Sequence, residues 1–201
     1  YSDAVSIETF FQYIKTLMPR LSLLGQIESM GEPDSRYITG VIRYRAAIAD
    51  IDSTKTSIMR NIRQIPDAVN ALVSKGEKVE VLYLANSSYL FRNLDTVVKI
   101  ANRNSVPVVS SDPISAAGSG VIFAYGPNYA KLAEATADLI IQFLGAESEA
   151  QQQDLFAEKV RVIEGDDAAQ VYVDAAAAAQ FGITIPPEIL ALSRNLSESP
   201  Q

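Results

Sequence analysis

The sequence predicts a three-layer α/β fold, in which a mainly parallel sheet lies between crossover helices. The first observation is that segments with helical spacing alternate with strand-like segments along the 201 residues. The second is that the strand-like segments are short, continuous apolar runs. Such runs are typical of strands that are buried on both faces and joined in parallel by helices. The hydrophobic content of 48% is sufficient for a core of this kind.

The first third of the chain is expected to form helix, strand, helix and strand. Apolar residues in 7–18 recur at helical spacing, and Pro19 ends the pattern. Residues 21–27 form a short apolar run, which indicates a strand. From about Asp34 the apolar residues fall on one face of a second helix, and 56–62 follow as the next strand candidate.

The middle of the chain continues this alternation. Pro66 and Gly76 bracket a short helix, with proline at its start and glycine past its end, as helix ends favour. Residues 79–84 are almost wholly apolar and predict a buried strand. A helix with apolar residues across 90–101 and a strand at 106–110 complete this part.

The last third opens with a strand at 120–125. A helix follows that begins at Pro127 and ends at Gly145, and the polar stretch 145–159 is expected to be a loop or a weak helix. The tail is expected to contain, in order, strand candidates at 159–165 and 169–174, an alanine-rich helix, an ordered segment at 183–190 and a frayed end.

The composition excludes several classes of function. The chain contains no cysteine and no histidine, so it has no thiol nucleophile, disulfide, Cys/His zinc site or imidazole base. Its net charge of −7 and the lack of a basic stripe argue against a nucleic-acid partner. No apolar stretch approaches the ~20 residues that span a bilayer. We expect no cofactor, no metal and no catalytic residue. Because the chain opens with Tyr1 rather than methionine, we expect a processed, trimmed or partial chain.

Small polar side chains gather where the predicted strands end. The carboxyl ends of parallel strands share one edge of a sheet, and ligands bind beyond that edge. Hydroxyl and amide groups suit a small polar ligand, because they form directional hydrogen bonds without burying a charge. The residues that we expect to bind a ligand are Ser29, Ser35, Asn86, Ser87, Ser88, Ser111, Asp112 and Tyr125.

A second interpretation applies to each of these residues. Serine, asparagine and aspartate are the preferred N-caps of helices, so each could simply begin the helix that follows its strand. One cap residue is sufficient, however, and residues 86–88 supply three in a row. Tyr125 could equally be part of the core or stack against a ligand.

Five motifs in order carry a resemblance to a known family: GEPDS, YLANSSYL, SVPVVSSD, GSGVIFAYGPNYAKLA and GITIPPEIL. With them the chain resembles the periplasmic substrate-binding proteins of ABC transporters with the type I fold. The closest group is described as uncharacterised or tryptophan/tyrosine-type, and the resemblance covers nearly the whole chain. Ser29 stands where the family usually has asparagine, residues 86–88 replace its Thr-Asp-Asn, and Ala133 replaces a glycine.

The resemblance implies a solute-binding component of an ABC importer. Such a protein binds a small polar metabolite, an amino acid or similar, in a cleft between two lobes and presents it to a membrane permease. The alternative is the extracellular ligand-sensing domain of a signalling receptor. An enzyme is not expected, since no nucleophile–base pair or phosphate-binding loop is visible. The implied location is periplasmic or extracytoplasmic, with a lipid anchor on the precursor.

The resemblance also implies that most of an N-terminal lobe is absent from this chain. Residues 1–118 would form the core of the C-terminal lobe, 119–146 a crossing strand and helix, 147–192 a return segment and 193–201 a frayed tail. The helix at 127–144 would lose its usual partner. We expect its apolar face to be covered by a second copy of the chain, by exchange between copies, or by folding back onto its own sheet.

Overall fold

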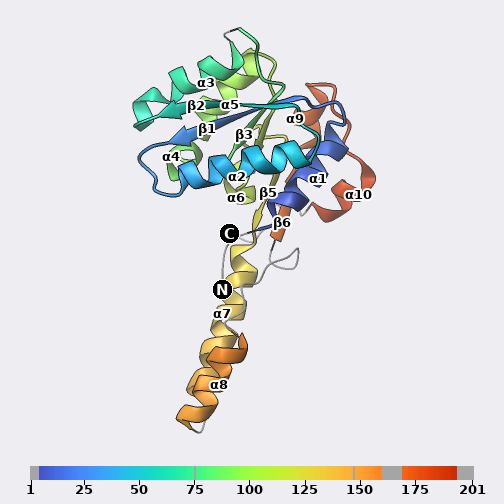
Figure 1. The fold of residues 1–201 in the computed structure, drawn as a ribbon. Helices are drawn as coiled ribbons and strands as arrows, with labels where there is room; N and C mark the ends of the chain where they lie inside the picture. The colour runs from blue at the N-terminus through green and yellow to red at the C-terminus, as the bar shows by residue number, and fades with distance from the viewer. Residues whose placement is uncertain (1–4, 75, 147, 160–168, 194–201) are drawn as a thin grey trace. The chain divides into compact units, whose positions relative to one another are not determined.

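The computed structural model describes residues 5–74, 76–146, 148–159 and 169–193 (Figure 1). Within these residues one sheet of six strands has the order β2-β1-β3-β4-β5-β6. The pairs from β2 through β5 are all parallel. The strands are β1 Leu23–Ser29, β2 Ser53–Met59, β3 Val81–Leu84, β4 Val108–Ser110, β5 Phe123–Pro127 and β6 Ala169–Val173. The predicted parallel α/β sheet is confirmed.

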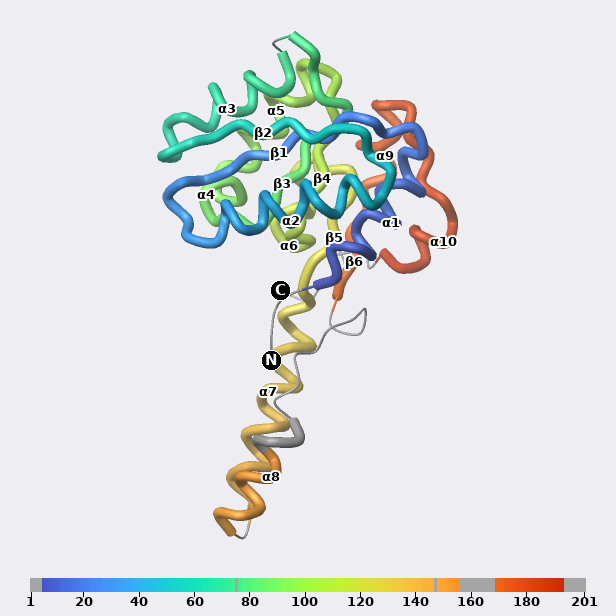
Figure 2. The backbone as a smooth tube through the Cα atoms, viewed as in Figure 1, coloured from blue at the N-terminus to red at the C-terminus, as the bar shows by residue number. Residues whose placement is uncertain are grey.

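Helices cover both faces of this sheet, which confirms the three-layer arrangement (Figures 1 and 2). Helices α1 (Ile7–Leu17) and α2 (Ser35–Ile48) lie on one face. Helices α3 (Ile65–Val73) and α5 (Leu94–Arg103) lie on the other face, where they pack against each other. Apolar residues at helical spacing turn one side of each of these helices toward the sheet.

The core is divided by the sheet into two parts. On the α3 and α5 side, aliphatic side chains from the helices pack against the inward residues of β1, β3 and β4. On the α1 side the core is aromatic. The Phe10 ring lies 4.5 Å from the Tyr83 ring and 6.2 Å from the Phe123 ring, centroid to centroid. Both faces of the sheet are therefore buried, as the continuous apolar runs predicted.

Several elements differ from the sequence-based expectation. Strand β2 begins three residues before the expected 56–62, because it is the outer strand and is only partly buried, so apolarity does not mark its ends. The polar stretch after Gly145, by contrast, contains a helix, α8, which is the second of the two possibilities expected for it. The remaining helices are η1 Ile62–Gln64, α4 Ser88–Phe91, α6 Pro113–Ala116, α7 Tyr129–Leu144, α8 Glu149–Lys159, α9 Ala175–Ala179 and α10 Pro187–Leu192. The strand expected at 159–165 and the frayed tail at 193–201 lie almost wholly outside the described residues.

The chain divides into two compact units. The larger unit contains Ile7–Tyr125 and the segment that begins at Val171, and it holds the sheet core. The smaller unit consists of Tyr1–Ser6 and Gly126–Gln170, and it contains α7 and α8, which contact each other. No helix in the described part of the chain is long and apolar enough to cross a membrane. The lobe boundaries expected from the resemblance stay a prediction.

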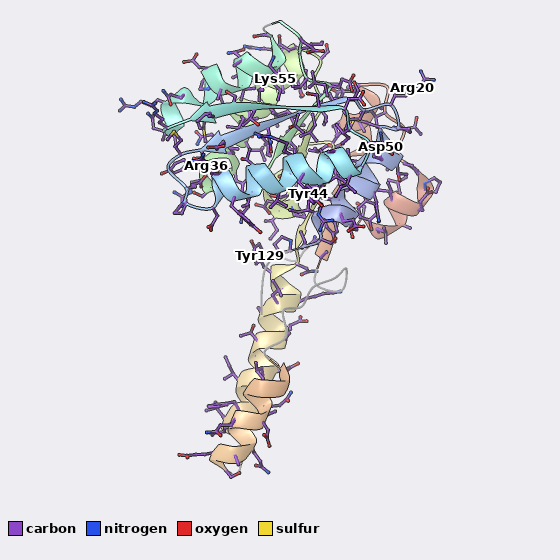
Figure 3. The ribbon with its side chains drawn as sticks, in the orientation of Figure 1. Arg20, Arg36, Tyr44, Asp50, Lys55 and Tyr129 are labelled. Atoms are coloured by element: carbon purple, nitrogen blue, oxygen red, sulfur yellow. The ribbon has the colours of Figure 1, made fainter. Side chains whose placement is uncertain are left out.

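Helix α7 carries an unusual amount of exposed apolar surface. None of its residues is buried. Ile140, Ile141 and Leu144 are 53%, 67% and 75% exposed. Tyr129, at the start of the helix in Figure 3, is also exposed. Large apolar side chains that are neighbours on one helix normally pack against another surface.

Candidate functional site

The loop between β1 and α2 folds back on the end of its own strand. The Ser29 backbone N–H donates to the Ser35 hydroxyl at 2.7 Å, and the Glu32 N–H donates to the Ser29 carbonyl at 3.2 Å. Ser29 and Ser35 are both buried. A Cβ atom at Gly31 would lie 2.9 Å from Cε2 of Tyr89, so glycine allows this loop to approach the segment after β3.

The Glu32 carboxylate joins this loop to the loop after β3. Its Oε2 atom accepts a hydrogen bond of 2.5 Å from the Ser87 hydroxyl. Its Oε1 atom accepts from the Ser88 N–H at 2.7 Å and from the Ser88 hydroxyl at 2.9 Å. Strands β1 and β3 are parallel neighbours in the sheet, so both loops leave the same edge. We call Ser29, Glu32, Ser35, Ser87 and Ser88 the edge cluster.

The hydrogen bonds of the edge cluster keep Glu32 ionised. Partial burial of the carboxylate favours its neutral form, but the hydrogen bonds from Ser87 and Ser88 outweigh this effect and hold the Glu32 pKa below its usual 4.5. The Ser29 hydroxyl is close enough to lower this pKa as well, although no hydrogen bond of normal geometry satisfies it. The cluster therefore holds a fixed negative charge at neutral pH.

Ser111 and Asp112 follow β4, the next strand of the sheet. The Ser111 N–H donates to the carbonyl of Leu84, the last residue of β3, at 2.9 Å, which places Ser111 beside the end of that strand. Its hydroxyl is buried without a hydrogen bond of normal geometry. It lies near the Tyr83 phenol, whose pKa is raised by burial and lowered to a smaller extent by Ser111.

Two of the expected ligand-binding residues act as helix caps. Asp112 caps α6, because its Oδ1 accepts from the Ile114 N–H at 3.0 Å and its Oδ2 accepts from the Ser115 hydroxyl at 2.5 Å. The Ser87 hydroxyl accepts from the Leu90 N–H at 3.3 Å and so caps α4, while it also donates to Glu32. The cap interpretation is therefore correct for both residues, and for Ser87 it does not account for all of its hydrogen bonds.

The other two expected residues lie apart from these hydrogen bonds. Asn86 is exposed beside Ser87. Tyr125 is only 2% exposed, and its ring lies 5.6 Å from that of Tyr13 on α1. The structure thus brings Ser29, Ser35, Ser87 and Ser88 together in one network. It places Ser111 at the end of the neighbouring strand. The role of all eight residues in ligand binding stays a prediction.

Glu32 is the residue that the sequence analysis did not select. Its position in the GEPDS motif was visible, but its contact with Ser87 spans 55 residues. That contact depends on β1 and β3 being neighbours in the sheet, which a list of strand ends does not reveal. An acidic residue in one loop, opposite adjacent hydroxyls in another, is the signal that could have indicated it.

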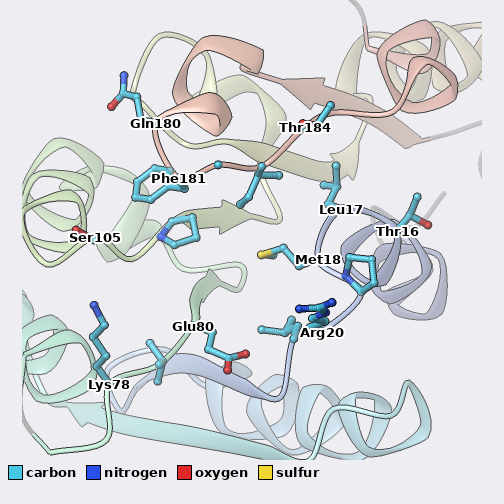
Figure 4. Close-up of a pocket in the computed structure, with 16 residues that line it drawn as sticks. Thr16, Leu17, Met18, Arg20, Lys78, Glu80, Ser105, Gln180, Phe181 and Thr184 are labelled. Carbon is cyan, nitrogen blue, oxygen red and sulfur yellow. The ribbon is translucent and has the colours of Figure 1, made fainter.

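A wide pocket lies at the opposite edge of the sheet, where the strands begin (Figure 4). Its volume is about 1060 Å³, and Glu80 lies between Lys78 and Arg20 in the view. The Glu80 carboxylate accepts from the Ser22 N–H at 2.7 Å, the Ser22 hydroxyl at 3.0 Å and the Leu23 N–H at 3.3 Å. Burial favours the neutral form of Glu80, but the hydrogen bonds from Ser22 and Leu23 outweigh this effect and lower the Glu80 pKa. None of the expected ligand-binding residues lines this pocket.

Comparison with known proteins gives consistent matches. The family model described as ABC transporter substrate binding protein matches residues 1–196. The chain is 26% identical over 147 residues to the tyrosine-binding protein of Clostridioides difficile strain R20291. The aligned residues make up 73% of this chain and 41% of that protein.

Solved structures share the fold. One is an ABC domain in complex with L-Trp from Streptococcus pneumonia, with a TM-score of 0.75, 21% identity and coverage of 96% of this chain and 60% of that one. Another is the ligand-free, open structure of a substrate binding protein with adhesive properties from Clostridium difficile. There the TM-score is 0.70 at 20% identity, with coverage of 92% of this chain and 58% of that one. This chain spans about 60% of the length of these structures.

Proposed function

Because the chain belongs to the ABC transporter substrate binding protein family, we propose that it forms one side of a binding site for an amino acid. Proteins of this family are extracytoplasmic and bind solutes rather than catalyse reactions. The resemblance inferred from the five motifs is therefore correct at the level of the family.

The edge cluster is the observation that carries this proposal. It lies at the carboxyl ends of β1 and β3, the edge at which parallel sheets bind ligands. It combines hydroxyl groups, backbone N–H groups and one fixed charge, as recognition of a small zwitterion requires. The names of two matched proteins point to the same ligand class, since one is called tyrosine-binding and another was solved with L-Trp.

We further propose that the intact protein closes a second lobe over this edge and delivers the amino acid to an ABC permease. This chain would then supply only half of the cleft, so its own affinity for the ligand should be weak. A lipid anchor that holds the intact protein at the outer face of the membrane is part of the same proposal.

The exposed face of α7 suggests a further partner for the isolated chain. Each large apolar side chain left in water forgoes about 1.5–3 kcal/mol of burial. Ile140, Ile141 and Leu144 are all exposed on this helix. We propose that two copies of the isolated chain cover this face by pairing through residues 127–144.

Native mass spectrometry of the intact protein tests the proposed function. A protein purified without added ligand and sprayed from volatile buffer should carry a bound mass equal to that of an amino acid. Release of that mass on denaturation would identify the ligand. A protein that carries no such mass, and that shows no heat of binding with any of the twenty amino acids, would contradict the proposal.

A further inference from the structure

We infer that Glu32 selects for the ammonium group of the ligand, with which its carboxylate forms an ion pair at the edge cluster. This inference rests on the proposed function and names the chemical group that the site requires. It gives Glu32 a role that is separate from connecting two loops.

The geometry leaves the Glu32 carboxylate able to bind one more donor. A carboxylate offers about four lone-pair positions. The Ser87 hydroxyl, the Ser88 hydroxyl and the Ser88 N–H account for three of them. Hydrogen bonds to both carboxylate oxygens also hold the Glu32 side chain in one orientation. The side chain would therefore lose little conformational freedom when an ammonium group binds.

Within the described part of the chain, no cation is recorded in an ion pair with Glu32. Among the residues that the structure describes, the ion pair that is recorded joins Arg45 to Glu8, on α2 and α1. Arg36 follows Ser35 at the start of α2 (Figure 3). No ion pair between Arg36 and Glu32 is recorded among the described residues. Neutral donors thus keep Glu32 ionised without cancelling its charge, and an ammonium group would complete the pair.

The Ser29 hydroxyl supplies an additional acceptor at the same place. Ser29 is 1% exposed, and its hydroxyl lies beside the Glu32 carboxylate without a hydrogen bond of normal geometry. An unsatisfied buried hydroxyl is uncommon in a native protein and is often explained by a missing partner. A primary ammonium group has three N–H donors, which Glu32 and Ser29 could accept together.

The alternative is that Glu32 only connects two loops. Glu80 provides the matched control, because it also accepts three hydrogen bonds from a neighbouring segment and also has a lowered pKa. It lies at the opposite edge of the sheet, away from the expected site. A purely structural role predicts the same behaviour for Glu32→Gln and Glu80→Gln.

Calorimetric titration of the intact protein distinguishes these roles. The probes are L-tyrosine and L-tryptophan, each compared with the propanoic acid that lacks only its ammonium group. We expect wild-type protein to bind at least one amino acid about 10- to 100-fold more tightly than its desamino analogue. Glu32→Gln should abolish this preference, and Glu80→Gln should preserve it.

Three results would overturn the inference while leaving the proposed function intact. The first is a Glu32→Gln variant that keeps the full preference for the amino acid. The second is wild-type protein that binds both members of a pair equally. The third is tighter binding of both members by Glu32→Gln, which would mean that Glu32 competes with the ligand carboxylate. Wild-type protein that binds none of the four probes, and that shows no heat of binding with any of the twenty amino acids, would instead remove the proposed function, and this inference with it.

Discussion

Ser87 and Ser88 are the residues through which the edge cluster can be tested most simply. Both hydroxyls donate to Glu32, at the edge of the sheet where we propose that the ligand binds. We expect Ser87→Ala combined with Ser88→Ala to weaken amino-acid binding by about 1–3 kcal/mol, through lost contacts and a less well held Glu32. Calorimetry on the intact protein measures this change.

The control for that experiment is Ser74→Ala. The Ser74 hydroxyl donates to the Asn70 carbonyl at the exposed end of α3, where no ligand is expected. Its removal should leave the affinity unchanged. If the double variant also binds with wild-type affinity, Ser87 and Ser88 are helix-terminal residues without a role in binding.

The lowered pKa of Glu80 predicts how stability depends on pH. Its folded-state pKa lies below the usual 4.5, so its ionised form stabilises the fold above pH 4.5. This contribution is lost as the pH falls from 4.5 through the folded-state value. The Glu80→Gln variant lacks this contribution. Its free energy of unfolding should therefore fall less steeply than that of the wild type as the pH drops below 4.5. Urea unfolding of the wild type and of Glu80→Gln at about pH 5 and about pH 3 gives the change in the free energy of unfolding with pH for each protein. Equal changes would show that the hydrogen bonds of Glu80 do not contribute to stability.

The individual residues of the site were only partly predictable from sequence. Small polar residues after strands marked the two loops that meet in the edge cluster, because strand ends and helix starts leave a local pattern. Glu32 was missed because its partners come from a loop 55 residues away. Ser87 is expected to bind the ligand, and its hydroxyl also caps α4 and donates to Glu32, a contact that the sequence did not indicate. Such contacts depend on strand order, which sequence patterns alone do not give.

At the scale of elements, Gly25 sets the packing of β1 against the start of β3. A Cβ atom at Gly25 would lie 2.8 Å from Cγ2 and 2.9 Å from Cγ1 of Val79, which is fully buried. Val79 is branched and short, so it cannot swing aside. We expect Gly25→Ala to reduce the free energy of unfolding by about 1–3 kcal/mol, as measured by urea denaturation.

Gly40 is the matched control for this prediction. It lies within α2, and a Cβ atom there would meet no atom within 4 Å. Alanine is the better helix former, so Gly40→Ala should raise stability by about 0.5–1 kcal/mol. A Gly25→Ala variant as stable as the wild type would show that β1 and β3 can move apart at low cost.

The elements were more predictable where burial was complete. The apolar runs correctly indicated β1, β3, β4 and β5, although their ends were displaced by up to three residues. Strand β2 is an outer strand and α8 has hardly any apolar face, so neither carries a strong apolar pattern. Hydrophobic periodicity reports burial, and it identifies partly exposed elements poorly.

At the scale of the whole molecule, the face of α7 predicts self-association of the isolated chain. Light scattering of residues 1–201 should give the mass of a dimer or larger species. Ile141→Ser combined with Leu144→Ser should shift it to a monomer, because both side chains are more than half exposed on this face. A monomeric wild-type chain would refute the prediction.

Tyr37 and Ile48 on α2 provide the control for association. They are also exposed large side chains, but they lie on a different helix. Tyr37→Ser combined with Ile48→Ser should leave the dimer intact. A monomer in this variant would assign the association to α2.

A crystal structure of the intact protein with a bound amino acid would show whether the edge cluster binds the ligand. We expect polar atoms of the ligand within about 3.2 Å of Glu32, Ser87 or Ser88, with the ammonium group nearest to the Glu32 carboxylate. A ligand seated instead in the pocket beside Lys78 and Glu80, or bound without contact to the edge cluster, would contradict this expectation.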